Sequence, residues 1–204
     1  MRGLAQVISV VFHPLWMPIA TYLVILALDP FIYVHQSVFS FLLFILIINT
    51  LAPGISVAIM VKRKMVTSLE IKNRKERLAP FILVLLYYIL AYILIRVKGI
   101  QVPEEIMSLL SALIFSLLVA MLVSLRMKIS VHLMAQGAIA GVLIALSIKH
   151  NLGLSAAVSL AVLIAALVAW ARLKLEVHSL KEVYAGYLTG AIIQFVFLFY
   201  GLCW

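Results

Sequence analysis

Charged residues and cysteine are both scarce in this chain of 204 residues. Charged residues make up only 11% of it, and just 7 residues are acidic. A soluble domain needs a far larger share of charged surface, so the composition excludes that class. The single cysteine, Cys203, cannot form an intramolecular disulfide bond, and no group of Asp, Glu and His residues has the spacing of a metal site. We therefore expect no disulfide framework, no bound metal and no cofactor.

Hydrophobic residues account for most of the chain instead. They make up 66% of it and form long runs rich in Leu, Ile and Ala, without the alternation of a β-strand. In hydrocarbon each backbone amide must be satisfied within its own segment, so such runs form helices rather than barrel strands. The expected fold is all-α: a polytopic helical membrane protein with about six to seven transmembrane helices, in a single membrane-embedded domain covering residues 1–204.

Charged, proline and glycine positions divide the chain into apolar segments that are each about long enough to span a bilayer. The first contains His13, Pro14 and Pro18, and no small-residue cleavage site follows it, so we expect a kinked or partly re-entrant helix rather than a signal peptide. These three residues and Trp16 either line a pocket or simply belong to a kinked helix with an interfacial aromatic residue. The segments are 7–28, 38–61, 79–97, 106–126, 131–148, 153–171 and 183–203.

Lysine and arginine are unevenly distributed between the two sides that these segments define. With the N-terminus inside, 13 of them lie on the inner side and 3 on the outer side, and setting aside five candidate phosphate ligands leaves 8 against 3. The positive-inside rule places the basic side in the cytoplasm, so we expect a protein of the bacterial inner membrane. This topology, together with anionic lipid headgroups, explains the net charge of +9, and nucleic acid binding is not indicated.

Three loops on the basic side carry residues that suit phosphate chemistry. The loops are 62–78, 127–132 and 172–182, and two crossings separate each from the next, so all three return to one face of the membrane. The even number of crossings between these loops does not show that they lie close together on that face. The candidate site residues are Arg74, Lys75, Arg77, Lys128, Ser130, His132, Arg172, His178 and Glu182.

These residue types can divide the work of phosphoryl transfer among them. Guanidinium and ammonium groups neutralise a phosphate, and Ser130 stands at the expected N-cap of a helix, whose free N–H groups favour an anion. Two histidines, His132 and His178, can act as nucleophile and proton donor. Glu182 lies four residues after His178, which is one turn along a helix, and can hold that imidazole in one tautomer.

The segment 171–182, ARLKLEVHSLKE, resembles the third motif of the type 2 phosphatidic acid phosphatase superfamily, SRxxxxxHxxxD. Arg172 and His178 are in register, while Ala171 replaces Ser and Glu182 replaces Asp. The resemblance implies that His178 is the nucleophile and forms a phosphohistidine, that Glu182 assists it, and that Arg172 binds the phosphate.

The other two motifs of that superfamily match less well. ISVH, residues 129–132, keeps Ser130 and His132 of the family's PSGH, and His132 would be the general acid. NRKERLAPF offers Arg77 for the family's KxxxxxxRP, but Pro80 comes two residues late and Glu70 stands where the family has Lys. Lys72, Arg74 or Lys75 would have to replace that lysine.

The resemblance covers about residues 70–190 and implies a metal-independent phosphatase of lipid phosphates. Phosphatidic acid, phosphatidylglycerophosphate and a polyprenyl phosphate or diphosphate are all candidate substrates, and the sequence does not choose among them. The alternative is a catalytically altered relative that binds or transports a lipid phosphate. The changes at Ile129, Val131 and Glu70 favour this alternative.

Overall fold

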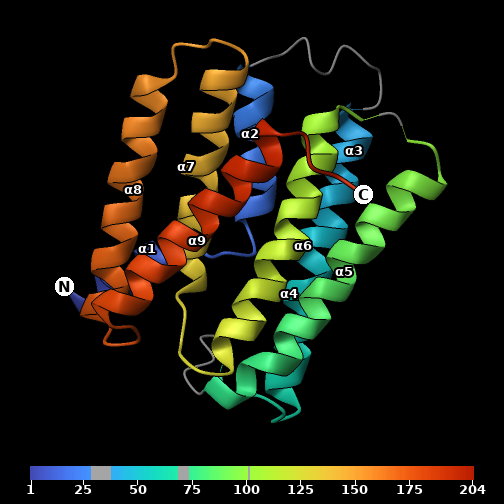
Figure 1. Cartoon of the computed structure of the whole chain (residues 1–204). Coiled ribbons are helices and arrows are strands. Elements are labelled where there is room, and N and C mark those ends of the chain that lie inside the picture. The colour runs from blue at the N-terminus through green and yellow to red at the C-terminus, as the bar shows by residue number, and fades with distance from the viewer. Residues whose placement is uncertain (29–37, 69–73, 101) are drawn as a thin grey trace.

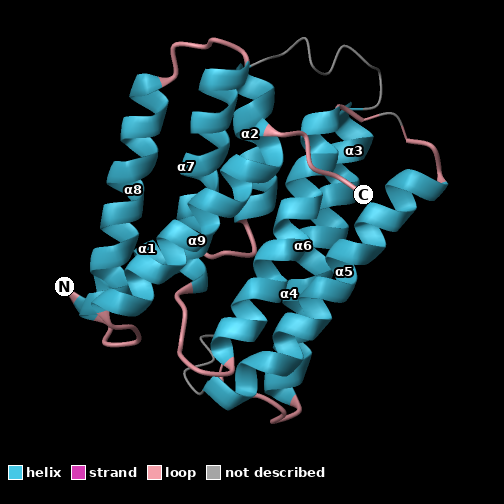
Figure 2. Ribbon diagram, in the orientation of Figure 1, coloured by secondary structure: helices cyan, strands magenta, loops and turns pink. Residues whose placement is uncertain are grey.

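The computed structural model describes residues 1–28, 38–68, 74–100 and 102–204, and within them all regular secondary structure is helical. Six helices are long and apolar enough to cross a membrane, so the protein is an all-α, polytopic integral membrane protein (Figures 1 and 2). They agree with the last six expected segments to within four residues at each end. The spans are Phe39–Lys62, α5 (Leu78–Val97), α6 (Glu104–Ser124), α7 (Val131–Lys149), α8 (Ser155–Lys174) and α9 (Leu180–Phe199).

The first of these spans is itself composite. It contains α3 (Val38–Ile45), a π-helical stretch (Leu46–Leu51) and α4 (Ala52–Lys62). A π-helical stretch inserts an extra residue into the helical repeat, and such insertions are frequent near functional sites.

The first apolar segment forms two short helices instead of one kinked helix. They are α1 (Arg2–Val11) and α2 (Met17–Leu28), joined by a turn that contains His13 and Pro14. Pro14 disfavours helical backbone at the residue before it, and Pro18 has no N–H to bond back to the preceding turn. Figure 1 shows α1 beginning beside the lower end of α8 and α2 rising toward the opposite end of the bundle. The break therefore lies inside the protein, where its side chains can line a site.

The centre of the bundle is formed by α6 and α7, which bury the largest share of their residues. Ile106 and Leu110 of α6 are fully enclosed in the main hydrophobic cluster, together with Val142 of α7. Buried polar residues share this interior, including Ser108 and Ser116 of α6. The core is thus apolar with isolated hydroxyl groups.

Helices α7 and α9 pack backbone to backbone. Each carries a G-x-x-x-G sequence, at 137–141 and 186–190. A Cβ atom at Gly190 would overlap the backbone carbonyl of Met134, so only glycine fits there. Small residues four apart permit such close approach between membrane helices. Because both helices begin at the same end of the bundle, this contact brings the residues that precede α7 next to those that precede α9.

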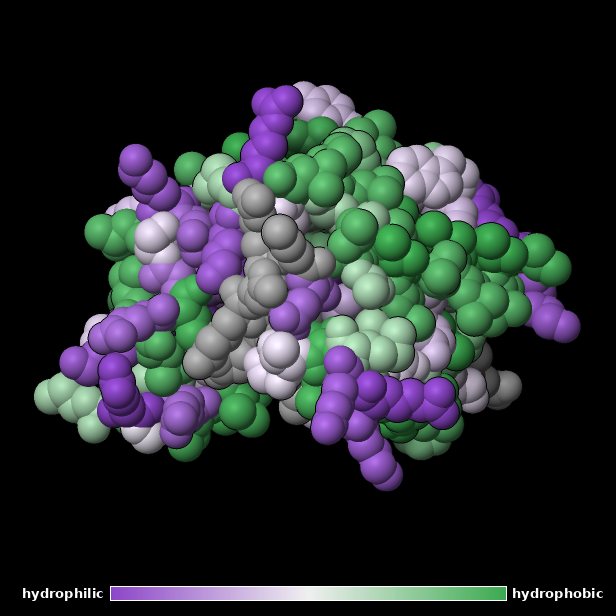
Figure 3. All heavy atoms as spheres, turned by 90° about the horizontal axis from the view of Figure 1, so that it is seen from below, coloured by the Kyte–Doolittle hydropathy of each residue, from purple (hydrophilic) through white to green (hydrophobic). Residues whose placement is uncertain are grey.

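The loops after α4, α6 and α8 all emerge at one end of the bundle, which is the lower end in Figure 1. The N-terminus lies at the same end, where Arg2 forms an ion pair of 3.4 Å with Glu176. Figure 3 looks onto this end and shows hydrophilic side chains grouped among the apolar helix ends. The arrangement agrees with the parity of the crossings, which predicted that the three basic loops share a face.

Candidate active site

A cavity of about 130 Å³ opens among α5, α6, α7, the end of α8 and the α1–α2 turn. Apolar side chains such as Phe81 and Val131 form much of its wall, and none of the described wall residues is acidic. Its polar wall comes from segments that are far apart in the sequence. These polar residues are His13, Arg77, Tyr88, His132, Arg172 and His178.

His178 and Glu182 form the shortest polar contact of the site. Nδ1 of His178 lies 2.6 Å from Oε2 of Glu182, and the imidazole is almost fully buried. With Nδ1–H donated to the carboxylate, Nε2 carries the lone pair. The contact thus fixes the tautomer in which Nε2 is the nucleophilic nitrogen.

The expectation that His178 and Glu182 lie on one helical turn is wrong, because α9 begins only at Leu180 and His178 precedes its N-cap, Ser179. Ser179 and Glu182 form a capping box instead: the Glu182 amide donates to the Ser179 hydroxyl, and the Ser179 amide donates to Oε2 of Glu182, each at 3.4 Å. Oε2 therefore holds both the start of α9 and the imidazole. The S-x-x-E motif of a capping box is present in the amino-acid sequence, so this arrangement could have been predicted.

Burial lowers the pKa of His178 to about 4. The hydrogen bond to Glu182 opposes this shift, while the positive charges of Arg77 and Arg172 add to it. The imidazole is consequently neutral at neutral pH. A neutral imidazole is the form that can attack phosphorus.

Two buried arginines give the cavity its positive charge. Arg77, the N-cap of α5, is 5% exposed and donates from Nη1 to the carbonyl of Ile129 at 2.9 Å. Arg172, in the last turn of α8, is 2% exposed. Burial lowers the pKa of Arg77 and the nearby carboxylate of Glu182 raises it, but a guanidinium stays charged at neutral pH. Two guanidinium groups in one cavity wall favour a bound anion.

Helix α1 holds the ring of His132 through a hydrogen bond. Its Nε2 lies 3.2 Å from the backbone carbonyl of Ser9, so Nε2 carries the hydrogen and Nδ1 is the other ring nitrogen available for proton transfer. An imidazolium keeps the bond to Ser9 unchanged, because Nε2–H donates in both protonation states. The Ser9 carbonyl therefore orients the ring without opposing its protonation.

The remaining predicted residues contribute less directly. Ser130 is the N-cap of α7, as predicted, but its buried hydroxyl has no hydrogen-bond partner among the described residues and does not cap the helix. Its amide donates to the carbonyl of Glu182 at 3.1 Å and so ties α7 to α9. Lys128 is half-buried and does not line the cavity. The side chains of Arg74 and Lys75 lie outside the described part of the structure.

His13 is the member of this cavity that the sequence left undecided. It lies in the α1–α2 turn, where its Nδ1 accepts a hydrogen bond from the Leu15 amide at 3.3 Å. Its ring meets that of His132 edge to face, with the centroids 5.2 Å apart. The signal in the sequence was the His13-Pro14 pair inside an apolar segment, which explains a kink equally well without a site.

Comparisons with known proteins add no relative. No family model, no curated protein and no solved structure matches this chain. Among the described residues, no group of three His, Cys, Asp or Glu side chains is placed to hold a metal ion. Functional inference therefore depends on the geometry of the cavity.

Proposed function

We propose that this protein is a membrane lipid phosphatase that works through a phosphohistidine at His178. The observation that carries the proposal is the placing of His178, oriented by Glu182, in one cavity with His132, Arg77 and Arg172. This set provides a neutral nucleophile, a second imidazole and two cations for the phosphate. The resemblance of 171–182 to the third motif of the phosphatidic acid phosphatase superfamily supports the same chemistry.

In the first step, Nε2 of His178 attacks phosphorus and the bond from phosphorus to the lipid oxygen breaks. The leaving oxygen takes a proton from Nδ1 of His132, which is protonated when the anionic phosphate is bound beside it, while Glu182 stabilises the positive charge that develops on His178. Arg77 and Arg172 neutralise the phosphoryl oxygens. In the second step, water attacks the phosphohistidine, His132 accepts the water's proton, and inorganic phosphate leaves.

The substrate of this proposal is a phosphate ester of a lipid, because the cavity lies within a bundle of membrane-spanning helices. The cavity wall combines apolar residues with the cationic set, which suits a phosphate attached to an apolar chain. The bilayer would supply such a molecule laterally. The positive-inside rule places the site near the cytoplasmic face of a bacterial inner membrane in this proposal.

Release of inorganic phosphate from a long-chain lipid phosphate tests the proposal. We expect the purified protein to catalyse it with divalent metal chelated, and vanadate to inhibit it as a mimic of the pentacoordinate state. Complete loss of turnover on chelation, restored by magnesium, would contradict the histidine mechanism.

A second candidate function is lipid-phosphate binding or transport without hydrolysis. The observation that favours it is the altered second motif, in which Ile129 and Val131 stand where the superfamily has proline and glycine. Stable lipid binding by the purified protein, with no phosphate released over many hours, would assign this function instead.

A further inference from the structure

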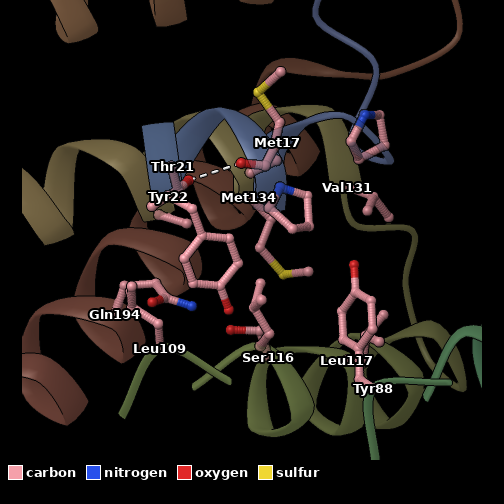
Figure 4. Close-up of a pocket in the computed structure, with 15 residues that line it drawn as sticks. Met17, Thr21, Tyr22, Tyr88, Leu109, Ser116, Leu117, Val131, Met134 and Gln194 are labelled. Carbon is pink, nitrogen blue, oxygen red and sulfur yellow. Dashed lines mark hydrogen bonds between the residues drawn. The ribbon is translucent and has the colours of Figure 1, made fainter. Parts of the chain in front are cut away.

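A second cavity, of about 70 Å³, adjoins the one that holds the histidines. Figure 4 shows Tyr88, Leu117 and Val131 at one side of it and Gln194 at the other. A ligand whose phosphate lies beside the arginines can therefore extend toward Gln194. The two cavities share the wall residues Pro14, Tyr88, Leu117 and Val131.

Most of this second wall is apolar, but at the Gln194 side it encloses the polar atoms of Gln194, Ser116 and Tyr22. Gln194 is 1% exposed and Ser116 is 5% exposed. Within the described residues, neither amide atom of Gln194 nor the hydroxyl of Ser116 has a hydrogen-bond partner. Figure 4 shows both side chains reaching into the cavity near the hydroxyl of Tyr22. Unpaired polar groups are costly in an apolar interior, so these two indicate a place where a bound molecule supplies the missing bonds.

Helix geometry puts Gln194 a short way beyond the expected phosphate. Gly186 of α9 packs against Ser130, Gly190 packs against Met134, and Gln194 lies one turn further on. Because a helical side chain leans toward the N-terminus of its helix, the Gln194 amide lies roughly 6 to 10 Å beyond the level of Ser130. An ester carbonyl or hydroxyl near the head of a lipid lies at a comparable distance from its phosphorus. A polyprenyl chain carries only hydrocarbon there.

We propose that the second cavity is a chain-binding subsite of the proposed phosphatase, in which Gln194 and Ser116 bind an oxygen of the lipid close to its phosphate. The inference rests on the proposed function for the position of that phosphate. The glutamine amide and the serine hydroxyl can each donate to an ester carbonyl. The subsite selects oxygen-bearing lipid phosphates over polyprenyl phosphates, because a hydrocarbon chain leaves both groups unpaired.

The variants Gln194→Met and Ser116→Ala test the polar pair. Methionine has nearly the length and volume of glutamine but no amide. Gln136→Met and Ser108→Ala are matched controls, since both residues are buried and line neither cavity. Each purified variant is checked for an unchanged melting temperature. It is then tested with dioleoyl phosphatidic acid, its diether analogue and a polyprenyl phosphate, for lipid binding by native mass spectrometry and for phosphate release.

We expect Gln194→Met to weaken binding of the diester lipid about tenfold, as the loss of one hydrogen bond does, and to change polyprenyl phosphate binding less than about twofold. The parent protein should bind the diester lipid better than the diether. The subsite would be overturned if Gln194→Met weakened the binding of all three lipids equally, or if the control variants showed the same losses of affinity. It would also be overturned if the parent protein bound the three lipids equally well.

The variant Ala138→Phe tests the position of the chain separately from the polar pair. Ala138 lines the second cavity only, so a phenyl ring there should reduce binding of every long-chain lipid and leave vanadate binding unchanged. Ala156→Phe, on the exposed face of α8, is the control. Unaltered long-chain binding in a folded Ala138→Phe protein would show that the chain lies elsewhere.

The subsite and the proposed function can fail independently in these assays. Selective lipid binding without phosphate release keeps the subsite and refutes the hydrolase. Phosphate release that does not distinguish the lipids keeps the hydrolase and refutes the subsite. Binding of none of the three lipids refutes both.

Discussion

One carboxylate oxygen connects the folding of a helix to the chemistry of the site. Oε2 of Glu182 accepts the Ser179 amide that begins α9 and also contacts Nδ1 of His178. Capping boxes use glutamate or glutamine at this position, so the helix start requires only the hydrogen-bonding oxygen. In the proposed mechanism, the negative charge is needed only when His178 becomes positive during phosphoryl transfer.

The variant Glu182→Gln should therefore fold normally and lose most of its activity. The amide oxygen still accepts from the imidazole but cannot offset its charge, and we expect kcat to fall roughly a hundredfold or more. Glu176→Gln is the matched control, because it removes an exposed carboxylate near the site. Near-normal kcat in Glu182→Gln, measured by phosphate release, would show that the mechanism does not need the negative charge of Glu182.

His178 should remain unprotonated well below the pH at which a free histidine takes up a proton. Its pKa is lowered to about 4, so the imidazole should stay neutral from neutral pH down to about that value. In the unfolded chain it titrates near 6.5, so the unfolded state binds more protons between these values and stability falls as pH falls through the interval. NMR of labelled histidine, with His178→Ala to assign the signal, checks this. A midpoint between 6 and 7 would contradict the burial of the ring.

The spacing of His178 and Glu182 predicted that these two side chains pair. The sequence could not predict which other residues surround the pair. Crossing parity placed Arg77, His132 and Lys128 at one face, and lateral position then depended on helix packing. Arg77 and His132 line the cavity and Lys128 does not. His13 joins them because a proline-broken segment folds into the bundle, and such a segment has no repeating pattern that fixes its direction.

At the scale of the element, the contact between α7 and α9 positions the site. His132 is in the first turn of α7, and His178 directly precedes the N-cap of α9. The close approach of the two backbones sets the distance between these ends. The helix bounds themselves were predictable from hydropathy, whereas this pairing required a contact that hydropathy does not describe.

The variant Gly190→Ala should accordingly damage both stability and activity. The added Cβ would overlap the Met134 carbonyl, and overpacking of this kind costs about 1 to 3 kcal/mol. Gly153→Ala is the control, because an added Cβ meets no atom within 4 Å there. Thermal unfolding of the two variants in the same detergent tests the contact. Equal melting temperatures would mean that the helices are not so closely packed.

The whole molecule has one strongly basic end, while at the other end Arg96, Lys98 and Lys149 are offset by acidic residues that include Glu104 and Glu105. The proposed orientation places the basic end, and with it the cavity of His132 and His178, in the cytoplasm. The six spans were predictable from composition and run length. The candidate phosphate ligands also add positive charge to the basic end, so labelling each end separately tests the orientation.

Single cysteines provide that test once Cys203 is replaced. Lys181 lies in the first turn of α9, at the end of the bundle that holds the site, and Lys98 follows α5 at the other end. Both residues are exposed, and the variants are Lys181→Cys and Lys98→Cys. An impermeant thiol reagent should label Lys98→Cys in intact cells and label Lys181→Cys only after the cells are opened. The reverse pattern would place the site outside.

Trapping of a phosphoenzyme would show whether His178 is the nucleophile. The protein is mixed with a lipid phosphate that carries radioactive phosphorus, quenched within one turnover, and digested for mass spectrometry. We expect an acid-labile, alkali-stable phosphoryl group on His178, absent from a folded His178→Ala variant that releases no phosphate. Turnover by His178→Ala at near the parent rate, or a phosphoryl group trapped on a different residue, would contradict the account.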